Sequence, residues 1–213
     1  KVITDAKGAF RFPEVPVKPE SVYMVTTTYS NVLYHSGRIA LGEAKEVEAP
    51  LTVYETTPTG EAIYIDSEHI IIEREADAFR VTEMLSLTNR GDRTYVGQAS
   101  GDKAEPYSLS FPLPEGYKGL KVMEMLQPEF IRQKPDGFSV VKNVLPGTSQ
   151  FGFSYQLATA SLPIRWDKKV VYPTKSLNVL HGDPTTNVTS NKLTDMGTVK
   201  FGDREYLLLK GEE

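Results

Sequence analysis

The sequence predicts an all-β protein made of two antiparallel β-sandwiches in tandem, of which the N-terminal one is incomplete. Three observations support this prediction. Apolar and polar residues alternate in several short segments, turn signals separate these segments, and helix signals are nearly absent. The length of 213 residues suits two small domains of about 100–150 residues each.

The alternating segments are the predicted strands, because successive side chains of a strand point to opposite faces of a sheet. The clearest alternation runs through residues 79–87, 107–113 and 151–157. Shorter apolar runs predict further strands at residues 22–25, 70–72, 170–172 and 177–180. The stretch 42–48 is rich in Ala, Glu and Lys but has no apolar face, so we expect a loop there rather than a helix.

Clusters of Gly, Pro, Asn and Asp predict the turns between these strands. They lie at residues 5–8, 89–92, 135–137, 146–147 and 182–184. The polar segment 55–60 contains Pro and Gly between two apolar runs, as a linker does. We therefore expect a partial sandwich at residues 1–57 and a second sandwich of about seven to nine strands at residues 58–213.

Residues 2–12 read V-I-T-D-A-K-G-A-F-R-F. This segment resembles the carboxypeptidase regulatory-like module, a transthyretin-like sandwich with a T-D-x-x-G turn, an F-x-F strand and a later strand entered through a Tyr. The counterparts here are Thr4, Asp5, Gly8, the pair Phe10 and Phe12, and then Tyr23. The resemblance covers roughly residues 1–55 and implies an accessory module of an exported bacterial protein.

The same resemblance implies that the first module is incomplete. The family has a hairpin ahead of the T-D-x-x-G strand, and this sequence begins too late to contain it. The second domain is similar to immunoglobulin-like sandwiches only in a general way, because it lacks the paired cysteines around a tryptophan.

Composition argues against several functional classes. The net charge is −4 and Lys and Arg are scattered, so neither nucleic acid nor a membrane surface is an expected partner. The chain has no cysteine, which removes disulfides, thiolate metal sites and cysteine nucleophiles. Phosphate-binding glycine loops and nucleophile elbows are also missing from the sequence. We therefore expect no catalytic residues and no cofactor.

His69 is the best local candidate for a metal ligand, because Asp66 and Glu68 are close to it in the sequence. In a regular strand Asp66 and Glu68 share one face while His69 points away, so a polar strand end at the surface is the stronger interpretation. His35 and His181 show no metal-ligand spacing and are also expected at turns or strand ends. We expect no metal site.

Glu83 stands in the middle of the apolar face of the predicted strand 79–87. Burying a carboxylate is costly unless a Lys or Arg pairs with it. One interpretation makes Glu83 an acid or base with a raised pKa. The favoured interpretation is structural, either an ion pair or a bulge that turns the side chain outward.

Trp166 is the only tryptophan, and with Tyr172 it is the candidate for stacking a sugar ring. Leu162, Ile164 and Trp166 alternate with polar residues or Pro, however, which favours packing of Trp166 in the core. Trp166, Tyr172, Glu83 and His69 are thus the candidate ligand-binding residues.

The leading functional hypothesis is a non-catalytic, extracytoplasmic binding or scaffold protein of the bacterial cell envelope, in the periplasm or at the cell surface. It would act on other proteins, in part by strand pairing at the open edge of the N-terminal module. The alternatives are a carbohydrate- or small-ligand-binding module and an accessory domain of a secreted hydrolase. The segment starts at Lys1 and stops soon after the apolar run 206–209, so we expect an export signal or a membrane anchor outside it.

Overall fold

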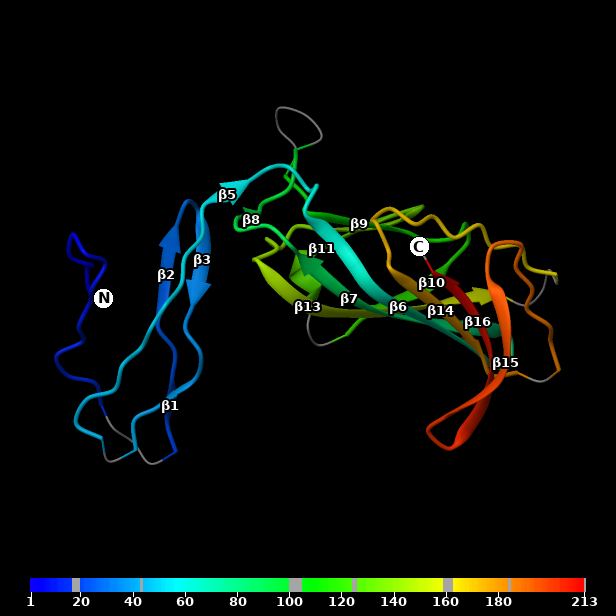
Figure 1. Ribbon diagram of the computed structural model, residues 1–213, viewed down its shortest axis with the longest axis horizontal. Helices are drawn as coiled ribbons and strands as arrows, with labels where there is room; N and C mark the ends of the chain where they lie inside the picture. Colours follow the sequence, from blue (N-terminus) through cyan, green and yellow to red (C-terminus); the bar gives the residue numbers. More distant parts are fainter. Residues whose placement is uncertain are drawn as a thin grey trace. The chain divides into compact units, whose positions relative to one another are not determined.

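The computed structural model confirms that the protein is all-β (Figure 1). It describes residues 1–16, 20–42, 44–99, 105–123, 126–158, 163–183 and 185–212. In these ranges the helical structure consists of one 3-10 turn, Pro128–Phe130, and no helix is long and apolar enough to cross a membrane. The chain divides into two compact units, Lys1–Tyr54 and Glu55–Glu213, three residues before the predicted boundary.

The first unit contains two short antiparallel ladders. A hairpin joins β2 (Thr26–Tyr29) to β3 (Val32–His35), and β1 (Val22–Tyr23) pairs with β4 (Ile39–Ala40). The hairpin turn consists of Ser30 and Asn31, whose φ angles of 47° and 61° suit the two-residue turn that matches the twist of paired strands.

The resemblance implied an F-x-F strand at Phe10 and Phe12, but the segment of residues 2–12 forms no strand. Its predicted turn is confirmed. The Asp5 carboxylate accepts hydrogen bonds from the backbone N–H groups of Lys7 and Ala9, and Gly8 has a φ of 80°. The rings of Phe10 and Phe12 lie edge to face, 6.1 Å apart, but Phe12 remains exposed. The sequence around Asp5 and Gly8 is therefore enough to form the turn, whereas a strand also requires a neighbouring strand to pair with.

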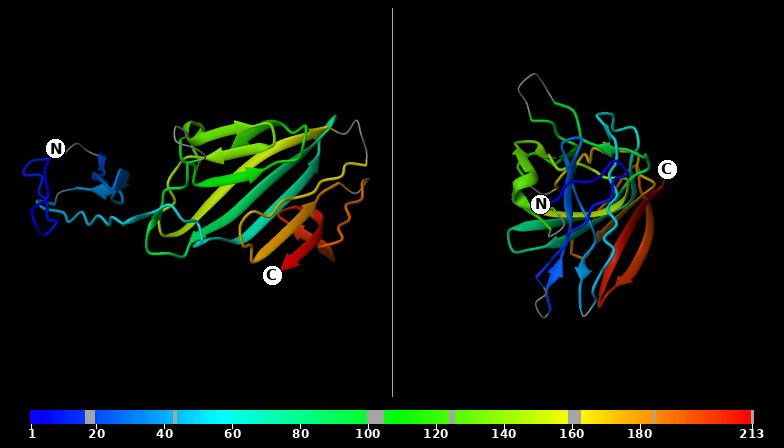
Figure 2. Two further views of the ribbon diagram at one scale, coloured as in Figure 1. Left: turned by 90° about the horizontal axis from the view of Figure 1, so that it is seen from above. Right: turned by 90° about the vertical axis from the view of Figure 1, so that its left-hand side faces the viewer.

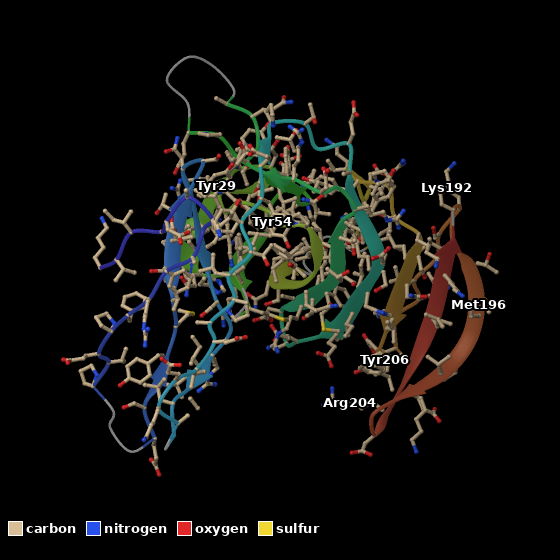
Figure 3. The ribbon with its side chains drawn as sticks, turned by 60° about the vertical axis from the view of Figure 1, so that its left-hand side comes forward. Tyr29, Tyr54, Lys192, Met196, Arg204 and Tyr206 are labelled. Carbon is tan, nitrogen blue, oxygen red and sulfur yellow. The ribbon has the colours of Figure 1, made fainter. Side chains whose placement is uncertain are left out.

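The second unit is built on a seven-stranded sheet. Its order is β10 (Lys118–Val122), β13 (Gly147–Ala158), β7 (Ala78–Asn89), β6 (Ile63–Arg74), β14 (Ser176–His181), β16 (Arg204–Glu212) and β15 (Thr194–Phe201). All neighbours are antiparallel except β6 and β14, which are parallel. At one margin of this sheet, Met196 on β15 is exposed while Tyr206 on β16 is buried (Figure 3).

A smaller sheet packs on the large one, so the second unit is a two-layer sandwich (Figure 2). Its strands are β11 (Ile131–Lys134), β12 (Gly137–Val140) and β9 (Leu109–Pro112), in that order. The rings of Phe111 and Phe138 lie 5.4 Å and 4.9 Å from the ring of Phe153 on β13, which joins the layers. A further two-residue parallel pair links β5 (Thr56–Thr57) to β8 (Thr94–Tyr95).

Most strands predicted for this unit are confirmed. Residues 79–87, 107–113, 151–157 and 177–180 all contribute strands with the expected alternation or apolar run. The strand predicted at residues 170–172 is wrong. Val170 and Val171 are exposed, and the segment lies outside the ladders of the described chain. In its described residues this unit has twelve strands, more than the expected seven to nine, because the two-residue strands β5 and β8 and the β15–β16 hairpin are added.

Strand β6 contains a β-bulge that decides which of its side chains face the core. Ile65 pairs with Leu87 and Ser67 with Ser86, so Asp66 is the extra residue. Such an insertion shifts the inward-facing positions by one residue. Ile63 and Ile65 face the core before the bulge, and Glu68 takes the core position after it.

Candidate functional site

Glu83 is completely buried at the centre of β7, with 0% of its surface exposed. It pairs with Phe153 on β13 and Ile70 on β6 in the regular part of the ladder, so no bulge turns it outward. Its carboxylate accepts a hydrogen bond of 2.9 Å from the hydroxyl of Tyr155 and one of 2.5 Å from the ammonium group of Lys168. The prediction that a basic residue pairs with Glu83 is confirmed.

Lys168 comes from residues 163–172, which we call the strap. The strap belongs to no strand, and its outward residues alternate with Ile164, Trp166 and Lys168, which are partly buried. The ammonium nitrogen also lies 2.8 Å from Oε1 of Glu68, at ion-pair distance but without an aligned hydrogen bond to that oxygen. Lys168 therefore connects the strap to two neighbouring strands of the large sheet.

The bulge in β6 explains why Glu68 is part of this cluster. The prediction that Asp66 and Glu68 share a face is wrong, because the extra residue puts Asp66 outward and Glu68 inward. Asp66 accepts hydrogen bonds from Thr88 and Arg90, and these two bonds lower its pKa. Glu68 is 2% exposed, and His69 points away from it, as predicted.

Burial and charge balance set the protonation of the cluster. Two carboxylates face one ammonium group, so the fully ionised cluster holds one excess negative charge away from water. Burial raises the pKa of Glu83 to about 7, and the Glu68 carboxylate adds to this against the opposing effect of Lys168. Burial disfavours the charged form of Lys168, but the attraction of Glu83 and Glu68 outweighs it, and the pKa of Lys168 is raised.

The cluster is closed to any large reactant. A small pocket beneath the strap is lined by Glu68 and Lys168 together with apolar side chains such as Ile65 and Leu85. Its free volume of about 10 Å³ is enough for about one water molecule. Each charged group in the cluster faces a partner of the opposite sign, as in a structural ion-pair network.

His181 is the last residue of β14, at a strand end as expected, and it is the only one of the three histidines that is buried. Its Nε2 lies 2.9 Å from the hydroxyl of Thr186, and this hydroxyl donates to Asp183. Thr186 therefore accepts from His181, and the buried Nδ1 of His181 has no hydrogen-bond partner. If Thr186 were a nucleophile, its hydroxyl would donate a hydrogen bond to the imidazole, and a carboxylate would accept one from the other ring nitrogen. The arrangement around His181 is the reverse.

A second pocket, of about 160 Å³, lies next to this network. Arg74 pairs with Asp183 and Arg204 pairs with Glu73, and Gly182 and Tyr206 complete the lining. Hydrogen bonding from Thr185 lowers the pKa of Asp183 to about 2. The charges of this pocket are thus balanced in pairs at neutral pH.

The two aromatic candidates do not form a shared platform. Trp166 packs edge-on against Tyr155 at 6.3 Å and joins the core, whereas Tyr172 packs against Phe111 and its hydroxyl accepts the N–H of Ser110. Leu162, which entered the predicted alternation, lies outside the described residues.

His69 lies in the middle of β6 and not at the expected strand end, and His35 belongs to the first unit. His69 is partly buried on the outward side of β6, and the Nδ1 of His35 contacts the backbone of Ser36. The sequence prediction missed Lys168 and Tyr155. The alternation of Ile164 and Trp166 continues to Lys168, and this pattern is the signal in the sequence that could have identified Lys168.

No family model matches the chain, and no curated protein matches it. Among solved structures, it is similar to an M1 zinc metallopeptidase from Deinococcus radiodurans, with 10% identity and a TM-score of 0.40 over 71% of this chain. A mutant of a two-domain M1 zinc metallopeptidase bound to L-tryptophan aligns with 12% identity and a TM-score of 0.37 over 70% of this chain. The chain spans 39% of the length of each of these structures. Likeness at this level does not bear on the activity of this chain.

Proposed function

We propose that this chain is a non-catalytic binding or scaffold protein of the bacterial cell envelope that acts through protein–protein contacts. Its N-terminal unit, Lys1–Tyr54, accepts a β-strand from a partner protein. The location in the envelope rests on the resemblance of residues 2–12 to modules of exported proteins. The binding role rests on the exposed surface of the N-terminal unit.

The observation that carries the proposal is the concentration of exposed apolar side chains in the N-terminal unit. Fourteen large hydrophobic residues are exposed in the described chain, and eight of them lie within residues 1–54, a quarter of the length. Ile3 is 91% exposed and Leu33 is 64% exposed. Exposed apolar surface at this density is typical of an interaction site.

The ladders of this unit support strand addition as the mode of binding. β2 and β3 pair only with each other, so each strand has one edge without a neighbouring strand in the described chain. The edge of a sheet that no strand covers binds an extended segment through main-chain hydrogen bonds. A two-stranded hairpin is marginal alone in water, so a partner strand would also stabilise it.

Site-specific photo-cross-linking in the native host tests the proposal. A photoreactive residue replaces Leu33 on β3, and the matched control carries it at Val170, which is 55% exposed in the second unit. We expect the Leu33 variant to form one discrete protein adduct in the envelope fraction. After the adduct protein is purified, its addition should slow hydrogen exchange in Thr26–Tyr29 and Val32–His35.

Three results would contradict the proposal. Adducts at Val170 but not at Leu33 would move the contact to the other unit. Unchanged hydrogen exchange in β2 and β3 would argue against strand addition. Recovery of the full-length protein in the cytoplasmic fraction would refute the location in the envelope.

A further inference from the structure

The groups that surround the Lys168 ammonium come from three adjacent strands of the large sheet. Glu68 lies on β6, Glu83 on β7 and Tyr155 on β13. Ladder hydrogen bonds fix these three strands relative to one another. Lys168, by contrast, is carried by the strap, which lies outside the ladders. The acceptor groups thus belong to the framework, and the cation belongs to a separate segment.

The acceptor groups suit one primary ammonium. Such a group offers three N–H donors around a compact charge. It lies 2.5 Å from Oε2 of Glu83 and 2.8 Å from Oε1 of Glu68. The Tyr155 hydroxyl holds the remaining oxygen of Glu83 at 2.9 Å. Oε1 of Glu68 is buried without a hydrogen bond, and Glu68 lines the small pocket beneath the strap.

We propose that Glu68, Glu83 and Tyr155 form a binding site for one primary ammonium group, which Lys168 fills as an intramolecular ligand. The strap is then a lid that opens when a small free primary amine takes the place of Lys168. This site is separate from the N-terminal unit, so its test does not depend on the strand-addition proposal.

Because of the two buried carboxylates, the lid opens only when another cation takes the place of Lys168. Withdrawing Lys168 alone would leave two buried carboxylates without a counter-charge, which is strongly unfavourable. A cation of the same size and hydrogen-bonding capacity removes that penalty. A quaternary ammonium carries the charge but has no N–H to donate, so it cannot replace Lys168.

The first experiment uses Lys168→Ala, which removes the four-carbon stem together with the ammonium group and so leaves the space of the whole side chain for butylammonium. The thermal unfolding midpoint is measured with rising butylammonium chloride, and with equal concentrations of tetramethylammonium chloride or NaCl. We expect butylammonium to raise the midpoint of the variant saturably, by about 3–5 °C. Lys169→Ala, which changes the exposed neighbour and keeps Lys168 as the competing ligand, is the matched control and should show a smaller rise in butylammonium than Lys168→Ala does.

The second experiment follows the lid in the unmodified protein. Trp166 is the only tryptophan and lies on the strap two residues from Lys168, so its fluorescence reports the strap directly. Butylammonium at pH 8 should increase acrylamide quenching of Trp166, whereas tetramethylammonium should not.

Two outcomes would overturn the inference. The first is an equal response of folded Lys168→Ala to butylammonium and NaCl. The second is unchanged quenching of Trp166 in butylammonium. If Lys168→Ala is unfolded in plain buffer, butylammonium must restore the sheet signal in circular dichroism where NaCl does not, and failure to do so counts against the ammonium site.

Discussion

At the residue scale, the excess negative charge of the buried cluster determines how stability depends on pH. The groups that face Glu83 are Glu68 from β6, Tyr155 from β13 and Lys168 from the strap. Burial, with the nearby negative charge of Glu68 added to it, raises the pKa of Glu83 from 4.5 to about 7, and a proton on Glu83 makes the cluster neutral. The folded protein therefore binds a proton between these two pH values that the unfolded chain has released.

We expect Glu83→Gln to remove part of the pH dependence of stability. Because the folded pKa of Glu83 is raised, its contribution to stability is complete below about pH 4.5 and is lost as the pH rises through about 7. Urea unfolding at pH 5.5 and pH 8 measures this effect. Between these two pH values, the free energy of unfolding of the unmodified protein should fall by about 2 kcal/mol more than that of the variant. Parallel pH profiles for the two proteins would contradict this assignment.

Lys168→Met should destabilise the protein by about 3–5 kcal/mol at pH 8, because it leaves buried carboxylates without their cation. The loss should be smaller at pH 5.5, where a proton on Glu83 neutralises one carboxylate. Lys169→Met changes an exposed neighbour and should stay within about 0.5 kcal/mol of the unmodified protein. Denaturant titrations of both variants check this, and equal losses would show that Lys168 has no special role.

The sequence alone placed Glu83 on the apolar face of its strand and gave an ion pair with Lys or Arg as one of two structural interpretations, because alternation over a single strand shows which face is apolar. It could not identify the partner. Lys168 is 85 residues away in the chain, and whether it meets β7 depends on how the strap crosses the sheet. The prediction for Glu68 was wrong for a different reason, because the face to which its side chain points depends on the bulge in β6.

At the element scale, the strands with regular alternation were the predictable part of the fold. Strands β7, β9 and β13 follow the alternation of their own side chains. The bulge at Asp66 was not predictable, because an extra residue is defined by the register with β7 and not by β6 itself. Residues 170–172 of the strap, by contrast, were predicted to form a strand that the structure does not contain. These residues are apolar enough for a strand, yet they line the small pocket and belong to no ladder of the described chain.

The β11–β12 hairpin offers a prediction about glycine at this scale. Gly137 begins β12 with a φ of 143°, and a Cβ there would lie 2.2 Å from the carbonyl oxygen of Phe111 on β9. We expect Gly137→Ala to cost about 3 kcal/mol or more, since this carbonyl moves only if the ladder is disturbed. Gly116 has a φ of 78° but open space around it, so Gly116→Ala should cost about 1–2 kcal/mol. Urea unfolding of the two variants measures both losses of stability, and similar losses would mean that the Phe111 carbonyl on β9 moves at little cost.

At the scale of the whole molecule, the two units differ in how completely each buries its own surface. The large sheet and the small sheet of Glu55–Glu213 enclose a continuous core of aliphatic and aromatic side chains. Within the described part of Lys1–Tyr54, the longest ladder has four residue pairs. The buried Tyr34, whose hydroxyl donates to the carbonyl of Tyr54, belongs to this ladder. The F-x-F strand that the resemblance to an exported module implied is not formed in this unit.

We therefore expect the two units to behave differently when they are expressed separately. Residues 55–213 should give a sheet spectrum in circular dichroism and a single cooperative unfolding transition, because their core is contained within the segment. Residues 1–54 should lack a cooperative transition, since a chain of this length with two short ladders cannot bury enough apolar surface to offset its conformational entropy. A cooperative transition and dispersed amide resonances for residues 1–54 would show that the unit is complete. The exposed edges of β2 and β3 would then no longer call for a strand from a partner.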